Sequence, residues 1–149
     1  MSELPSPRGF LSANESARVA AAIDEVERRT SAELKVVVVR HCWTDINKKA
    51  AAIFRKLGLD RTEERSCVLV LLVTTNREFL IHGDEGIHAK VPEGFWDAVR
   101  DTMQGHFAGG RFAEGLCEGV RLIGERLTES SPRRADDVDE IPDGVAYEE

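Results

Sequence analysis

The chain has 149 residues, of which 42% are apolar, and this length predicts one globular domain with a sizeable core. Its 27 acidic residues outnumber its 20 basic ones, and the net charge of −7 argues against a nucleic-acid-binding protein. The longest apolar run, residues 67–73, is far shorter than the roughly 18 residues of a bilayer span. Residues 1–7 contain two prolines and no apolar secretion segment, so we expect a cytoplasmic protein without direct membrane insertion.

The first half of the chain predicts two helices and two buried strands. A capping box at Ser12-Ala13-Asn14-Glu15 begins a helix whose apolar stripe ends near Arg29. The continuous apolar run of residues 34–39 predicts an interior strand. A second helix is predicted over residues 46–57 and a second interior strand over residues 67–73. A strand, helix and strand in this order predict a parallel pair.

The second half of the chain predicts a hairpin and two further helices. Residues 74–77 are few enough for a hairpin, so a third strand over residues 79–82 is expected to be antiparallel. Pro92 suits a first helical position and predicts a helix over residues 93–107. The last helix, from Phe112 to Leu127, contains three glycines whose spacing favours close backbone packing: Gly115, Gly119 and Gly124.

These elements together predict an α/β fold, a three-layer α/β/α sandwich with a mixed, largely parallel, Rossmann-like sheet and about four main helices. Residues 135–149 contain seven acids and no basic residue, so all of the net charge lies there. We therefore expect a disordered N-terminus over residues 1–10, a folded domain over residues 11–128 and an acidic, disordered tail over residues 129–149. The apolar tail residues that would favour docking on the body are Val138, Ile141 and Val145.

The cysteines do not predict a reactive or metal-bound thiol. Cys42, Cys67 and Cys117 are an odd number without C-x-x-C spacing, so we expect buried free thiols. His41 and Cys42 follow the first strand at its carboxyl end, where open α/β sheets commonly bind ligands. Neighbouring residues of an extended chain point to opposite sides, which disfavours a nucleophile and base pair here.

Four strings of sequence follow one another in an informative order: residues 30–37, 67–72, 79–87 and 106–115. In this order and spacing they resemble the TPM domain family over residues 10–128. The resemblance implies an α/β/α fold, divalent cations at an acidic edge and an acid-phosphatase activity. The best-described relatives are thylakoid-lumen proteins of photosystem repair, and members also resemble accessory or assembly factors of membrane complexes.

One loop departs from the pattern of that family. The family usually leaves its third strand through threonine, glycine, any residue, glycine, leucine and glutamate, and reaches a proline and aspartate at the next helix. Here the run is residues 82–88, followed by Pro92 and Glu93. The loop is one residue longer, His88 stands where a carboxylate is expected, and Glu93 replaces the aspartate.

The predicted topology itself brings three loops to one edge of the sheet. If the third strand is antiparallel, residues 83–88 emerge beside residues 31–33 and beside the polar loop of residues 60–66. Such oxygen-rich clusters suit hard cations such as Ca²⁺ or Mg²⁺, and the alternative interpretation is a set of surface ion pairs around a tight turn. The carboxylates expected there are Glu33, Asp60, Glu63, Glu64, Asp84, Glu85 and Glu93.

Together with the resemblance, this edge predicts a site for Ca²⁺ or Mg²⁺. Asp84 and Glu85 are the expected ligands, with Glu33 across the edge and His88 or Glu93 as a further ligand.

Two functions of different classes are compatible with these residues. The first is a divalent-cation-binding accessory module that recognises a protein partner or a membrane complex, and it agrees with the neutral body and the lack of an evident nucleophile. The alternative is a weak metal-dependent acid phosphatase, in which Arg61 or Arg65 would neutralise the charge of a phosphate group.

Overall fold

The structure is a computed structural model, and it describes residues 10–62, 65–75, 77–130, 132 and 145–148. Its elements are α2 (Ala13–Glu27), β1 (Glu33–Val39), α3 (Ile46–Lys56), the 3-10 helix η1 (Leu59–Arg61), β2 (Cys67–Val73), β3 (Glu78–Gly83), α4 (Glu85–His88), α5 (Phe95–Ala108), α6 (Phe112–Ser130) and β4 (Val145–Glu148).

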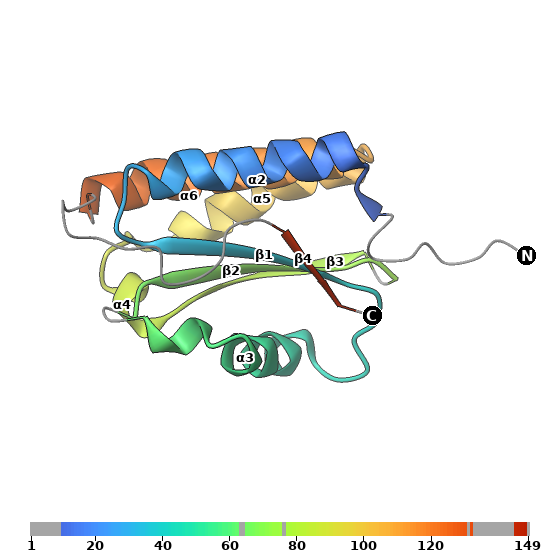
Figure 1. Ribbon diagram of the computed structural model, residues 1–149, viewed down its shortest axis with the longest axis horizontal. Coiled ribbons are helices and arrows are strands. Elements are labelled where there is room, and N and C mark those ends of the chain that lie inside the picture. Colours follow the sequence, from blue (N-terminus) through green and yellow to red (C-terminus); the bar gives the residue numbers. More distant parts are fainter. Residues whose placement is uncertain (1–9, 63–64, 76, 131, 133–144, 149) are drawn as a thin grey trace, which may run out of the picture.

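The elements form the three-layer α/β/α sandwich that the sequence predicts. The sheet has the order β3-β2-β1-β4, in which β1 pairs in parallel with both β2 and β4, and β2 pairs antiparallel with β3. Helices α2, α5 and α6 cover one face of the sheet and α3 covers the other (Figure 1). The mixed sheet and the antiparallel third strand are therefore confirmed.

The two central strands are buried along their whole length. All seven residues of β1 and all seven of β2 are buried, because both faces of the sheet carry helices. The side chains alternate between two cores: one lies under α2, α5 and α6, and the other lies under α3. This confirms the prediction of two interior strands, and Val36, Val38, Val70 and Leu72 all face the first core.

The boundaries of two helices differ from the sequence prediction. Helix α5 begins at Phe95 and not at Glu93, because Gly94 adopts a left-handed conformation with φ of 82° that no helix continues through. Helix α6 continues to Ser130, so the domain boundary predicted at residue 128 falls inside a helix. The capping box of α2 is confirmed: the Glu15 amide donates to Ser12 Oγ over 3.1 Å, and the Ser12 amide donates to Glu15 Oε1 over 2.9 Å.

The last part of the predicted tail forms strand β4, and disorder in the rest of the tail stays a prediction. Val145–Glu148 pairs with Val36–Val39 and closes the sheet beside β1. Of the three apolar tail residues that favoured docking, Val145 packs against the core under α2. Val138 and Ile141 lie outside the described residues.

No described helix has the length and apolar character needed to cross a bilayer. The longest, α6, has 19 residues but carries several charged side chains along its length. The cytoplasmic location stays a prediction.

The three glycines of α6 mark sites where other elements approach its backbone. A Cβ atom at Gly124 would lie 2.8 Å from Val26 Cγ1 of α2, and one at Gly115 would lie 2.5 Å from Phe107 Cε1 of α5. Gly119 faces the flexible side chain of Met103 in the same way. The predicted close packing of these glycines is confirmed, and α6 is the helix on which α2 and α5 converge.

We expect Gly124→Ala to destabilise the protein by about 1–3 kcal/mol, because the β-branched side chain of Val26 has no freedom to withdraw from the added methyl group. The matched control is Gly105→Ala in α5, where an added Cβ meets nothing within 4 Å. That change should stabilise the protein by up to about 1 kcal/mol through helix propensity. Urea denaturation measures both, and equal effects of the two substitutions would contradict the packing described here.

Candidate functional site

Three segments meet at the amino-terminal edge of the parallel strands, as the topology predicts. The Glu33 amide at the start of β1 donates to the Ser66 carbonyl over 3.0 Å. The Asp84 amide after β3 donates to the Cys67 carbonyl over 2.9 Å, and the Gly86 amide donates to the Arg65 carbonyl over 2.9 Å. Backbone hydrogen bonds thus hold the start of β1, the start of β2 and the exit of β3 together.

The central interaction of this edge is an ion pair between Arg65 and Asp84. Arg65 Nε donates to Asp84 Oδ2 over 2.7 Å and Arg65 Nη2 donates to Asp84 Oδ1 over 2.9 Å, so the pair is bidentate. Asp84 is only 4% exposed, and its Oδ1 also accepts a hydrogen bond from the Glu85 amide over 2.8 Å. Asp84 is therefore the N-cap of α4, a short helix that the sequence does not predict.

Other carboxylates surround the same guanidinium. Arg65 Nη1 lies 3.6 Å from Glu85 Oε1, and the pKa of Arg65 is raised first by the hydrogen bond with Asp84 and further by the charges of Glu85 and Asp60. The cluster named here the acidic edge consists of Asp60, Asp84 and Glu85 around Arg65. The positive charge at the centre of this cluster is the guanidinium of Arg65.

The remaining predicted ligands occupy different positions. Glu33 is buried, only 5% exposed, as the first residue of β1 opposite Cys67. His88 and Glu93 are exposed, His88 at the end of α4 and Glu93 before α5. Arg61 is exposed in η1. Glu63 and Glu64 lie outside the described residues.

Within the described part of the chain, no three His, Cys, Asp or Glu side chains are arranged to hold a metal ion. The donor types at the acidic edge suit a hard cation, but both oxygens of Asp84 bind Arg65. A cation at Asp84 therefore requires Arg65 to withdraw.

The three thiols differ in burial. All three cysteines are free, and Cys67 is buried, whereas Cys42 and Cys117 are partly buried. Burial raises the pKa of the Cys67 thiol, and the nearby charge of Glu33 raises it further, so this thiol is neutral.

The loop after β1 presents an aromatic side chain to solvent. Cys42 Sγ donates to the Thr44 carbonyl over 3.0 Å, whereas His41 Nδ1 lies 3.2 Å from Thr75 Oγ1, so thiol and imidazole have different partners. The Trp43 ring stacks on the His41 ring with centroids 4.9 Å apart and is 86% exposed.

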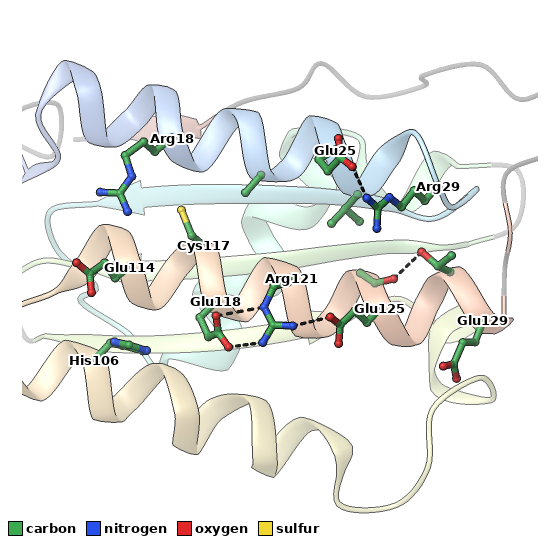
Figure 2. A pocket seen from close by; sticks show the side chains of 14 residues that line it. Arg18, Glu25, Arg29, His106, Glu114, Cys117, Glu118, Arg121, Glu125 and Glu129 are labelled. Atoms are coloured by element: carbon green, nitrogen blue, oxygen red, sulfur yellow. Dashed lines mark hydrogen bonds and ion pairs between the residues drawn. The ribbon is translucent and has the colours of Figure 1, made fainter.

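A surface groove with a volume of about 870 Å³ lies over the contact between α2 and α6, with His106 of α5 at one side (Figure 2). Its apolar lining includes Ala22, Val26 and Gly124. Burial raises the pKa of the Cys117 thiol in this groove. Sequence reasoning missed this surface because only the contact between two helices distant in the sequence creates it.

Most charges along the groove pair with one another. Arg121 lies between Glu118 and Glu125, with its Nη1 2.5 Å from Glu125 Oε1, and its hydrogen bond lowers the pKa of Glu118 (Figure 2). Arg29, just after the end of α2, pairs with Glu25 of α2 four residues earlier. Spacings of three and four residues in the sequence are the signal for these pairs. Exposed pairs of this kind contribute little to stability and assign no chemistry to the groove.

An α/β/α sandwich with a mixed sheet, three helices on one face and a charged loop cluster at the amino-terminal edge of its parallel strands defines a class of small domain. The chain belongs to the TPM domain family, whose match covers residues 6–126. No curated protein matches the chain.

Three solved structures share the fold. The BA42 protein from the psychrophilic bacterium Bizionia argentinensis is 32% identical with a TM-score of 0.89, and the match covers 99% of this chain and 100% of that one. The N-terminal domain of a P. gingivalis protein is 24% identical with a TM-score of 0.69, covering 83% of this chain and 80% of that one. The N-terminal domain of the cg2496 protein from Corynebacterium glutamicum is 15% identical with a TM-score of 0.66, covering 94% and 93%.

His82 of β3 links the acidic edge to the α3 side of the sheet. Its ring packs edge-on against Phe54, with centroids 4.9 Å apart. Burial lowers the pKa of His82 below its ordinary value of 6.5, the charge of Asp84 opposes this shift and that of His88 adds to it. The folded state therefore binds a proton at His82 less readily than the unfolded state does.

We expect stability to fall as the pH decreases through about 6.5, because protonation of His82 then favours the unfolded chain. His82→Gln should reduce this loss, whereas the exposed His88→Gln should leave most of it in place, because burial is the main cause of the shift. Urea denaturation at about pH 7.5 and about pH 5.5 measures the difference. The same pH dependence in the wild type and in His82→Gln would contradict the assignment.

Proposed function

We propose that this TPM domain is a divalent-cation-binding accessory module that recognises a protein partner within a larger complex. The observation that carries the proposal is the acidic edge, where the carboxylates of Asp60, Asp84 and Glu85 surround the guanidinium of Arg65. Clusters of carboxylate oxygens suit Ca²⁺ and Mg²⁺. A cation competes with Arg65 for these oxygens, so binding is coupled to the position of one side chain.

The proposed ligands start with the two residues that touch Arg65. Asp84 and Glu85 bind the cation when the guanidinium withdraws, and Glu33 lies across the edge as the next carboxylate. His88 or Glu93 would complete the set after a rearrangement of the segment from α4 to α5. Ca²⁺ is the better match than Mg²⁺ because it tolerates a flexible, irregular ligand set.

A binding role is favoured over the alternative of a weak metal-dependent acid phosphatase. In that alternative Arg65 neutralises phosphate charge, but its guanidinium already forms a bidentate pair with Asp84. Arg61 is exposed and lies on η1. The described thiols and imidazoles offer no hydrogen-bonded nucleophile and base pair, since Cys42 and His41 bind Thr44 and Thr75.

The first test uses the competition between Arg65 and the cation. Arg65→Gln should bind Ca²⁺ more tightly than the wild type, because the substitution removes the guanidinium that pairs with both oxygens of Asp84. At a Ca²⁺ concentration about 100 times Kd, the free energy of unfolding should rise by roughly 2.7 kcal/mol, and EDTA should reverse the gain. Thermal unfolding and calorimetry measure the two effects.

Arg100→Gln is the matched control, since Arg100 is an exposed arginine that pairs with Asp97 on α5. Its Ca²⁺ affinity should equal that of the wild type. Absence of Ca²⁺ and Mg²⁺ binding up to millimolar concentration in both the wild type and Arg65→Gln would refute the cation site. Binding that survives the double change Asp84→Asn and Glu85→Gln would place the ion elsewhere.

The second test separates binding from catalysis. We expect the wild type and Glu85→Gln to hydrolyse a generic phosphomonoester at the same background rate, with or without Ca²⁺ or Mg²⁺. Glu85 is exposed, so this substitution leaves the core intact. A metal-dependent rate in the wild type that Glu85→Gln abolishes would establish the phosphatase alternative.

A further inference from the structure

Strand β4 closes the edge of the sheet although it lies outside the part of the chain that matches the family. The family match ends at residue 126, and β4 spans Val145–Glu148. Among the described strands, β4 is the end strand of the sheet and pairs with β1 (Figure 1). Without β4, β1 would itself be the edge strand of the domain.

The four β1 residues that pair with β4 are all valine. Val36, Val37, Val38 and Val39 are each 0% exposed in the presence of β4. A strand edge of this composition pairs readily with any extended segment, and proteins normally cover or charge such an edge. Here the cover is a segment of only four residues.

The contacts of β4 define what the edge recognises. Val145 and Tyr147 pack against the core under α2, and Ala146 packs against the core under α3. The hydroxyl groups of Tyr147 and Ser16 of α2 are hydrogen-bonded. The edge therefore accepts an apolar, a small and an aromatic residue in succession, in parallel orientation to β1.

Strand β4 is short and lies at the end of the sheet. In the sequence, residues 131–144 lie between the last residue of α6 and the first residue of β4. Val145, Ala146 and Tyr147 are half-buried, and the described backbone pairing of β4 covers Val36–Val39.

We propose that the edge of β1 under β4 is a docking site for an extended segment of a partner protein, and that β4 is its built-in, displaceable occupant. The partner segment carries the pattern of β4 and adds to the sheet by strand addition. This docking site rests on the proposed accessory function, and it implies that the protein partner contains an extended segment. A parallel segment that continues past the position of Glu148, opposite Val39, runs towards the loop with the exposed Trp43.

The first measurement uses the intact wild-type chain. Amide protons bonded between β1 and β4 should exchange with solvent at least about tenfold faster than those bonded between β1 and β2, because β4 opens locally. Equal exchange rates for the two ladders would mean that β4 leaves only on global unfolding. That result would overturn the proposal.

The second measurement supplies the segment in trans to the full chain. The double variant Val145→Asp and Tyr147→Asp removes the apolar contacts of β4 and opens the edge. A dye-labelled peptide with the sequence of residues 144–149 (Gly-Val-Ala-Tyr-Glu-Glu) should bind this variant at least about tenfold more tightly than the wild type, whose own β4 competes. Fluorescence anisotropy measures the binding, and a peptide with the same Val→Asp and Tyr→Asp changes is the matched control.

Circular dichroism establishes that the double variant is folded, and Tyr147→Ala is the milder variant to use if it is not. No binding of the peptide to a folded, opened variant at about 1 mM, or equal binding of both peptides, would overturn the proposal. Wild-type dimers that exchange β4 would show that the occupant is a second copy, and the partner assignment would be wrong. Because all arms run in EDTA, failure of the cation site leaves this outcome unaffected.

Discussion

The burial of β1 on both faces and along both edges is the constraint on which the rest of this structure depends. Each of its seven residues is buried, so both faces need a helical layer and both edges need a strand. Helices α2, α5 and α6 supply one layer and α3 supplies the other, while β2 and β4 supply the edges (Figure 1). The glycines of α6 are a consequence, because α2 and α5 must both approach α6 closely to cover the same face.

The same constraint explains why charge collects at one end of the strands. Side chains that follow or precede the apolar runs of β1 and β2 cannot enter either core, so the polar residues gather where three segments meet. Asp84 is buried there, and a buried carboxylate requires hydrogen-bond donors. Arg65 and the Glu85 amide provide them, which makes the ion pair a structural part of the edge.

The apolar runs and the capping box were readable from the sequence because local patterns determine them. Residues 67–73 have no polar side chain, and Ser12 and Glu15 contact each other within one turn of helix. The start of α5 could not be predicted from the sequence, because Pro92 suits a turn as well as a first helical position. The left-handed conformation of Gly94 decides between the two.

Long-range pairing explains the other departures from the sequence prediction. Arg65 and Asp84 are 19 residues apart, and their charges alone do not show whether the guanidinium faces a phosphate group or a neighbouring carboxylate. Strand β4 could not be predicted from the sequence for the same reason. Seven acids in the tail indicated solvation, whereas Val145 and Tyr147 gain their favourable packing only against β1 and α2, far away in the sequence.

The acidic edge and the proposed docking site for a partner strand lie near opposite ends of β1. Glu33 begins β1, whereas β4 pairs with Val36–Val39, and at about 3.3 Å per residue Glu33 lies roughly 15 Å from the centre of the paired segment. Coupling between them would require β1 to shift in register. Its side chains interlock with two packed cores, and a shift by one residue would exchange the side chains of the two faces. A cation at one end and a partner strand at the other should therefore contribute independently to binding.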